Sequence, residues 1–273
     1  MKTRYQQLFH NLYLRKEGCF VPFIILGDPT IEISLKIVDI LIENGADALE
    51  LGIPFSDPMA DGPIIQNANL RAFKNGITIN KCFEMLHIIR TKYSNIPIGL
   101  LLYANLAYQM GINQFYKLCK NIEIDSVLFP DVPIQEYSNF LQGSETYNVS
   151  PIFMCPPNAD DIYLKKLGMH DTSYVYLLSR SGVTGIHNHS NIILNKLVQK
   201  CKKIISLPLL QGFGINSPTQ IKNILHSGVE GIICGSAIIK IIENYYLNLK
   251  KMFNQLKNFI FLLKESTKNV YLY

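Results

Sequence analysis

Two acidic residues stand where they could transfer protons. Glu50 lies inside an apolar run, between Leu49 and Leu51, and Asp61 follows eleven residues later in a stretch rich in Pro, Gly and Asp. A glutamate in an apolar environment loses hydration, which raises its pKa and suits it to proton transfer near neutral pH. An aspartate on a loop nearer water should stay ionised and act as a hydrogen-bond acceptor or electrostatic anchor. Because such surroundings separate the two pKa values, the pair predicts an acid/base site.

Each acid also has an ordinary interpretation. Glu50 could be a strand-end residue that reaches solvent or pairs with a lysine. Asp61, which precedes a Gly-Pro dipeptide, could be a simple turn residue. The two residues alone leave both interpretations open.

Glycines are concentrated after three late apolar runs, and Ser236 directly follows the last of them. These glycines are Gly182, Gly185, Gly212, Gly214 and Gly235. Glycine lets backbone N–H groups turn toward a ligand with no Cβ in the way. Ser236 is predicted to open a helix, whose first turn offers unpaired N–H donors and partial positive charge. Each glycine alone could serve only a turn, but the set predicts a phosphate site.

The elements that must position these residues follow one recurring pattern, in which an apolar run, a turn and an amphipathic stretch alternate. Eight runs read as strands: 19–26, 47–53, 97–103, 125–129, 150–154, 173–179, 208–212 and 230–235. Continuous apolar strands that alternate with helices indicate a parallel sheet covered on both faces. Eight such units favour a closed (β/α)₈ barrel, whose active sites lie at the carboxyl ends of the strands.

Helix signals and two additional helices complete the predicted fold. Apolar residues repeat near a 3.6 period from Ile31 to Ile42, and Ser217 to Gln220 has the pattern of an N-cap with Pro at the first helical position. A helix over roughly 3–16 could plug the barrel bottom. A C-terminal helix should pack its apolar stripe on the barrel, with Leu249, Met252, Phe253, Leu256, Phe259, Ile260 and Leu263 on that face. We expect one domain over residues 1–273.

Composition limits the classes of function. The net charge of +5 is mild and spread along the chain, which argues against nucleic-acid binding and modestly favours an anionic substrate. No apolar stretch approaches the ~18 residues that span a bilayer, and the amino terminus lacks the pattern of a signal peptide. The six cysteines form no C-x-x-C pair, so we expect reduced, mostly buried thiols in a cytoplasmic protein.

Several motifs resemble the tryptophan synthase α chain family, in order along nearly the whole chain. They are "LELGIPFSDPMADGPIIQNANLRAF" (49–73), "LLSRSGVTG" (177–185), "PLLQGFGI" (208–215) and "GSAIIKIIE" (235–243), with "FVPFIILGDPT" (20–30) and "FPDVP" (129–133) in support. The C-terminal helix is the part least like the family. The resemblance implies a lyase that splits indole-3-glycerol phosphate into indole and glyceraldehyde 3-phosphate by a retro-aldol reaction, without a metal or an organic cofactor in this chain.

The resemblance also implies a role for each site residue. Glu50 would transfer the protons, and Asp61 would accept the indole N–H and stabilise the cationic indolenine. Tyr176 would orient the substrate. The apolar slot for the indole ring would comprise Phe23, Leu101, Leu128, Phe213 and Ile233, and the phosphate would be held by Gly185, Gly214, Gly235 and Ser236.

Mobile loops and a partner chain belong to the same resemblance. Loops 54–62 and 180–190 would act as lids, with Thr184 hydrogen-bonded to Asp61 in the closed state. Family members pair with a β chain that carries pyridoxal phosphate, in a tetramer of two α and two β chains, and indole passes between them. Residues expected to face that partner are Pro54, Asp57 and Asn105.

Three other functions compete with this prediction. A metal-dependent epimerase would need ligands such as the pair His187 and His189, for which a solvated loop is the preferred interpretation. A glycosidase also uses two carboxylates, but a glycine-rich phosphate corner does not suit a neutral sugar. A binding subunit that mainly activates its partner is the third alternative. Arg180 could contact substrate, although a loop salt bridge is preferred.

Overall fold

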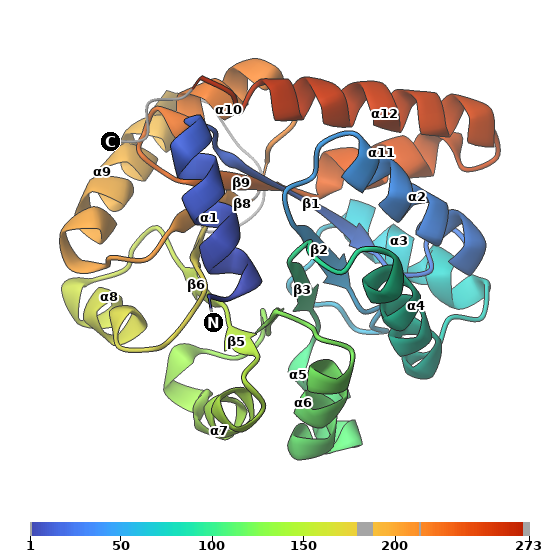
Figure 1. The fold of residues 1–273 in the computed structure, drawn as a ribbon, viewed down its shortest axis with the longest axis horizontal. Helices are drawn as coiled ribbons and strands as arrows, with labels where there is room; N and C mark the ends of the chain where they lie inside the picture. The colour runs from blue at the N-terminus through green and yellow to red at the C-terminus, as the bar shows by residue number, and fades with distance from the viewer. Residues whose placement is uncertain (1, 179–187, 213, 270–273) are drawn as a thin grey trace.

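A computed structural model describes residues 2–178, 188–212 and 214–269, and it contains a barrel of parallel strands inside a layer of helices (Figure 1). The strands are β1 Cys19–Ile25, β2 Leu49–Gly52, β3 Ile98–Leu101, β4 Ser126–Leu128, β5 Ser150–Pro151, β6 Phe153–Cys155, β7 Val175–Leu178, β8 Leu209–Gly212 and β9 Gly231–Cys234. The helices are α1 Arg4–Arg15, α2 Ile31–Glu43, α3 Pro63–Lys74, α4 Ile79–Lys92, α5 Ala104–Met110, α6 Ile112–Asn121, α7 Ser138–Tyr147, α8 Asp161–Gly168, α9 Asn188–Ile204, α10 Pro218–Leu225, α11 Ser236–Tyr245 and α12 Leu249–Glu265, with a short 3₁₀ turn at Ile134–Glu136.

The sheet order confirms the predicted barrel. Neighbouring strands run β5-β4-β3-β2-β1-β9-β8-β7-β6, and every pairing is parallel. The predicted fifth strand is divided at Ile152: β5 pairs with β4, and β6 pairs with β7. The Ile152 N–H still donates to the Val127 carbonyl at 2.9 Å. The ring of strands is therefore joined through this one stretch of chain.

Helix α1 covers the amino-terminal end of the barrel, as predicted (Figure 1). Its Tyr5 is 2% exposed, and its hydroxyl lies 3.1 Å from the hydroxyl of Ser126. The ring of Tyr5 also packs edge-on against Tyr174. A Cβ on Gly99 would lie 2.8 Å from the Ser126 hydroxyl and 3.2 Å from that of Tyr5, so glycine leaves room for the plug.

The C-terminal helix packs on the barrel with most of the predicted stripe. Met252, Leu256, Ile260 and Leu263 are fully buried, and Phe253 and Phe259 are partly buried. Leu249 is 37% exposed, because it occupies the first position of α12 beyond the packed face. All six cysteines are buried and free, which agrees with the predicted reduced thiols. Within the described residues, no helix is long and apolar enough to cross a membrane.

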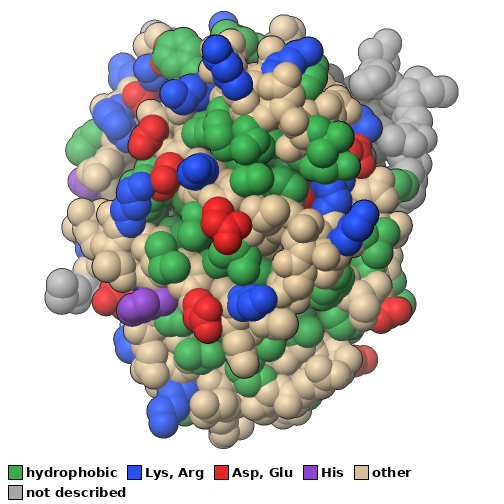
Figure 2. All heavy atoms as spheres, turned by 90° about the vertical axis from the view of Figure 1, so that its right-hand side faces the viewer, with side chains coloured by type: hydrophobic (Ala, Val, Ile, Leu, Met, Phe, Trp, Pro, Cys, Tyr) green, Lys and Arg blue, Asp and Glu red, His purple; other side chains and the backbone are tan. Residues whose placement is uncertain are grey.

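The surface charge is mixed on the face at the right-hand side of Figure 1, which Figure 2 turns toward the viewer. Figure 2 shows lysines and arginines scattered among acids there, with apolar side chains gathered in the upper half. The described side chains on this face form no continuous basic stripe of the kind that follows a nucleic-acid backbone.

Three acids fasten the amino-terminal end of the barrel by one recurring contact. Each stands just before a strand and accepts the backbone N–H at the start of the neighbouring strand. At 2.8 Å in each case, Asp47 accepts from Phe20, Asp125 from Ile98, and Glu230 from Leu209. Each acid also pairs with a cation, namely Lys264, Arg90 and Lys202, respectively. Backbone and side chain together thus fix the strand starts.

We expect Asp125→Ala to lower the free energy of unfolding by about 3 kcal/mol or more, because Arg90 would remain buried without its carboxylate. Urea unfolding followed by circular dichroism measures the change. The control is Glu265→Ala, which removes an exposed pair with Lys268 and should leave the midpoint unchanged. Equal effects of both substitutions would contradict the structural role of Asp125.

Candidate active site

Glu50 lies inside the barrel wall, on β2. Its register partners are Phe23 on β1 and Gly99 on β3, and it is 3% exposed. Burial disfavours the charged carboxylate and raises the pKa of Glu50 to about 8. Burial raises the pKa values of Tyr5 and Tyr176, and the charge of Glu50 adds to both rises, which places its carboxyl group near these two side chains inside the barrel. At pH 7 the side chain is mostly protonated.

Asp61 lies in the segment between β2 and α3 and is half-buried. Burial raises the pKa of Asp61 to about 6, although a hydrogen bond from Tyr103 opposes the rise. The loop is folded onto the rim, so Asp61 is less accessible to water than a residue on an open loop would be. Even so, Asp61 is mostly ionised at pH 7, and its pKa lies below that of Glu50.

Tyr103 is a site residue that the sequence prediction did not include. It follows β3, is 3% exposed, and its hydroxyl accepts from the Ala60 N–H at 3.0 Å. Its ring stacks on Phe55 with the centroids 5.0 Å apart. It therefore holds both ends of the loop that carries Asp61. The available signal was its place at the end of a predicted strand, on the same rim as Asp61.

The Tyr176 hydroxyl, on β7, interacts with the charges of both acids. Its pKa is raised mainly by burial, and further by the charges of Glu50 and Asp61. A Cβ on Gly212 would lie 1.9 Å from the Tyr176 hydroxyl oxygen, so only glycine leaves room for this ring. Gly212, which the sequence grouped with the phosphate glycines, is thus explained by the space that Tyr176 needs.

The predicted apolar slot is made by residues on four strands. Phe23, Leu128 and Ile233 are buried, and Leu101 is half-buried. A Cβ on Gly235 would lie 2.7 Å from the Phe23 ring, so this glycine borders the slot. Since Phe23 is the register partner of Glu50, the acid, the slot and the start of α11 are neighbours.

The predicted phosphate corner has the backbone features of an anion site. Ser236 begins α11 and Gly235 precedes it, with no side chain capping the first turn. Gly214 has φ +73°, a left-handed conformation that favours glycine. The predicted cap of α10 is present, with Ser217 accepting from the Gln220 N–H. The Gln220 side chain bonds the Asn216 N–H and the Gly214 carbonyl, so it also fixes this loop.

Some predicted residues lie outside the described part of the chain. These are Arg180, Gly182, Thr184, Gly185, His187 and Phe213, so most of loop 180–190 stays a prediction. His189 belongs to α9. Within the described ranges, no group of three His, Cys, Asp or Glu residues could hold a metal ion.

The residues predicted to face a partner lie after β2 and β3. Asp57 and Asn105 are exposed, whereas Pro54 is buried within this chain. Two large apolar side chains on the same segments are also exposed, Met59 at 85% and Tyr108 at 51%.

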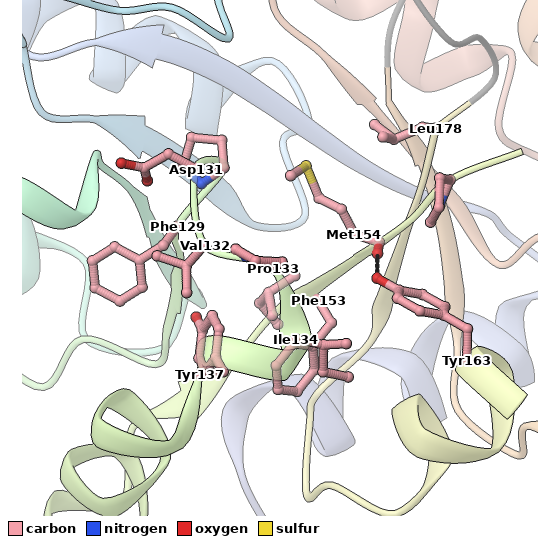
Figure 3. A pocket seen from close by; sticks show the side chains of 13 residues that line it. Phe129, Asp131, Val132, Pro133, Ile134, Tyr137, Phe153, Met154, Tyr163 and Leu178 are labelled. Carbon is pink, nitrogen blue, oxygen red and sulfur yellow. Dashed lines mark hydrogen bonds between the residues drawn. The ribbon is translucent and has the colours of Figure 1, made fainter.

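A cavity of about 280 Å³ opens beside this site, at the rim near β4, β6 and β7 (Figure 3). Its lining is mostly apolar and includes Phe129, Pro133, Phe153 and Met154, with the Tyr163 hydroxyl donating to the Met154 carbonyl at 2.7 Å. None of the candidate site residues lines it. The register pairs Met154 with Tyr176, so the cavity adjoins the site.

Comparisons with known proteins agree with the resemblance. The family model described as "Tryptophan synthase alpha chain" matches residues 9–268. A tryptophan synthase alpha chain of Buchnera aphidicola is 56% identical over 98% of this chain and 99% of its own, and one of Escherichia coli is 55% identical over 97% and 99%. The tryptophan synthase subunit alpha of Legionella pneumophila has a TM-score of 0.89 at 26% identity, covering 98% of this chain and 99% of its own. A chain of the Pyrococcus furiosus tryptophan synthase a2b2 complex has a TM-score of 0.81 at 31% identity, covering 91% and 98%.

We expect Glu50→Gln to stabilise the fold increasingly as pH rises. The folded pKa of about 8 exceeds the ordinary 4.5, so between these values the folded chain keeps a proton that the unfolded chain has released. Wild-type stability therefore falls as pH rises through this window, and the amide removes that loss. The stability difference between the variant and the wild type should grow by roughly 2–4 kcal/mol from pH 5 to pH 9 in urea unfolding. Glu136→Gln, at an exposed acid, is the control; a difference that does not change with pH would contradict the raised pKa.

We expect Tyr103→Phe to raise the pKa of Asp61 above about 6, because the Tyr103 hydrogen bond lowers it. The aromatic stacking on Phe55 should survive in this variant. Carbon-13 NMR titration of the carboxyl measures the pKa. Tyr108→Phe, at an exposed tyrosine of α5, should leave it unchanged, and the Tyr103 contact is refuted if both variants titrate like the wild type.

Proposed function

The chain belongs to the tryptophan synthase alpha chain family, and from this premise we propose how its residues carry the family's reaction. It is a lyase that cleaves indole-3-glycerol phosphate to indole and glyceraldehyde 3-phosphate, and it works with a β chain. The observation that supports the site assignment is Glu50: it is buried, mostly protonated at pH 7, and adjacent to Phe23.

Glu50 transfers the protons in the proposed mechanism. Cleavage requires a proton on C3 of the indole ring and the removal of one from a glycerol hydroxyl. A carboxylic acid with a pKa near 8 can donate the first and, as the carboxylate, accept the second. The acid returns to its starting state, so one residue completes the proton balance as the carbon–carbon bond breaks.

Asp61 stabilises the charged intermediate. With a pKa of about 6 it is mostly ionised at neutral pH, so it can accept the indole N–H and offset the positive charge of the indolenine. Tyr103 holds its loop in place. Tyr176, next to both carboxylates, orients the substrate. In this proposal the different surroundings of the two acids assign them different roles.

The remaining residues bind the two ends of the substrate. The indole ring lies against Phe23, Leu101, Leu128 and Ile233, together with Phe213. The phosphate accepts hydrogen bonds from the backbone N–H groups of Gly214, Gly235 and Ser236, together with Gly185. The start of α11, at Gly235 and Ser236, adds partial positive charge. Thr184 closes loop 180–190 over Asp61.

The partner and the cellular setting complete the proposal. Asp57 and Asn105 face the β chain. Pyridoxal phosphate belongs to the β chain, and the reaction proposed for this chain uses no metal. We also propose that residues 1–273 form one domain, since their strands pair in one sheet, and that the protein is cytoplasmic.

The decisive test is to incubate the purified chain with indole-3-glycerol phosphate, with and without the β chain, and to measure indole. The wild type should release indole in both cases, faster with the partner. Glu50→Gln should bind the substrate but lose roughly 10²–10⁴-fold in turnover, whereas Glu136→Gln should retain it.

Absence of indole from the wild type in both conditions would refute the lyase function and favour a binding subunit. Substantial cleavage by Glu50→Gln would instead remove Glu50 from the proton-transfer role while leaving the reaction in place.

A further inference from the structure

Helix α3 connects the proposed catalytic loop to two other parts of the site. It begins at Pro63, two residues after Asp61, and it lies against the end of β1 and along α11 (Figure 1). Any displacement of α3 therefore moves Asp61 relative to the start of α11. The contacts that hold α3 determine the geometry of both.

Arg71 on α3 makes the strongest of these contacts. Its Nε and Nη2 donate to the two carboxylate oxygens of Asp28, each at 2.8 Å. Asp28 follows β1 at the carboxyl end of the barrel and is 1% exposed, while the Arg71 side chain is 14% exposed. A two-point contact between a planar guanidinium and a buried carboxylate fixes orientation as well as distance.

The same helix is tied to α11. Arg71 Nη1 lies 3.4 Å from Glu243, and Asn67 donates to the same carboxylate oxygen at 2.9 Å. Lys240 holds the other oxygen of Glu243 at 2.7 Å. Since α11 begins at Ser236, these contacts join the proposed phosphate corner to α3.

A third contact reaches the beginning of the catalytic loop. Asn69, 3% exposed, accepts the Phe55 N–H at 3.2 Å and donates to the Ile65 carbonyl at 3.0 Å. The loop that carries Asp61 is therefore held by α3 at both ends, through Asn69 at one and the chain itself at the other.

We infer that Arg71 is a positioning residue, whose two-point contact with Asp28 sets where Asp61 lies relative to the substrate. The inference rests on the proposed function, in which Asp61 contacts the indole N–H. Arg71 itself contacts no reacting atom in this scheme. Its effect passes through α3 to the loop, and a small displacement of a catalytic carboxylate slows turnover more than it weakens binding.

The test is Arg71→Lys in complex with the β chain, because lysine keeps the charge and loses the two-point geometry. We expect kcat for indole formation to fall roughly tenfold while KM changes less than about twofold. The matched control is Arg90→Lys, which removes a guanidinium from the buried Asp125 at the opposite end of the barrel. That variant should lose stability and keep kcat.

Wild-type turnover in Arg71→Lys, or an equal loss of kcat in both variants, would overturn the positioning role while the lyase function stands. A wild-type complex without activity would instead refute the proposed function itself. If Arg71→Lys does not fold, Asp28→Asn with Arg71→Gln replaces the ion pair by two neutral amides. That double variant should show the same selective loss of kcat, and its absence would also overturn the inference.

Discussion

The proposed chemistry depends on one constraint: Glu50 is buried, and no cation among the described residues pairs with it. Burial is the cause that raises its pKa to about 8. Burial also raises the pKa values of Asp47 and Asp125, but a lysine beside the first and two arginines beside the second oppose that rise. A barrel of apolar strands supplies this environment readily, because its interior is filled by side chains from every strand. The acid form at neutral pH is thus a property of the fold around Glu50.

The contacts that hold the strand starts lie at the amino-terminal end of the barrel, and the residues of the proposed chemistry lie toward its carboxyl end. At the amino-terminal end, charged side chains fasten strand starts through paired hydrogen bonds, as at Asp125 and Arg90. At the carboxyl end, glycines leave space for rings, as Gly212 does for Tyr176, and side chains such as Tyr103 and Asn69 hold the loop that carries Asp61.

The sequence predicted the parts that depend on local pattern. The eight apolar runs, the plug helix and the Ser217 cap all follow from periodicity or capping chemistry, and the raised pKa of Glu50 follows from its apolar neighbours. The parts that it missed depend on contacts between distant segments. Tyr103 meets Asp61 only when the third strand and the second loop share a rim. Likewise, Gly212 is explained by a ring on another strand, and at Ile152 the chain changes its pairing from β4 to β7.

The plug at the bottom has a bearing on chemistry at the top. Tyr5 is buried against Ser126 and Tyr174. Burial raises the pKa of its hydroxyl, and the charge of Glu50 adds to that rise. The first helix is therefore part of the dielectric boundary that keeps water from the acid. Changes at the amino terminus that loosen this helix would hydrate Glu50 from below and return it to an ordinary carboxylate, even with every residue of the rim intact.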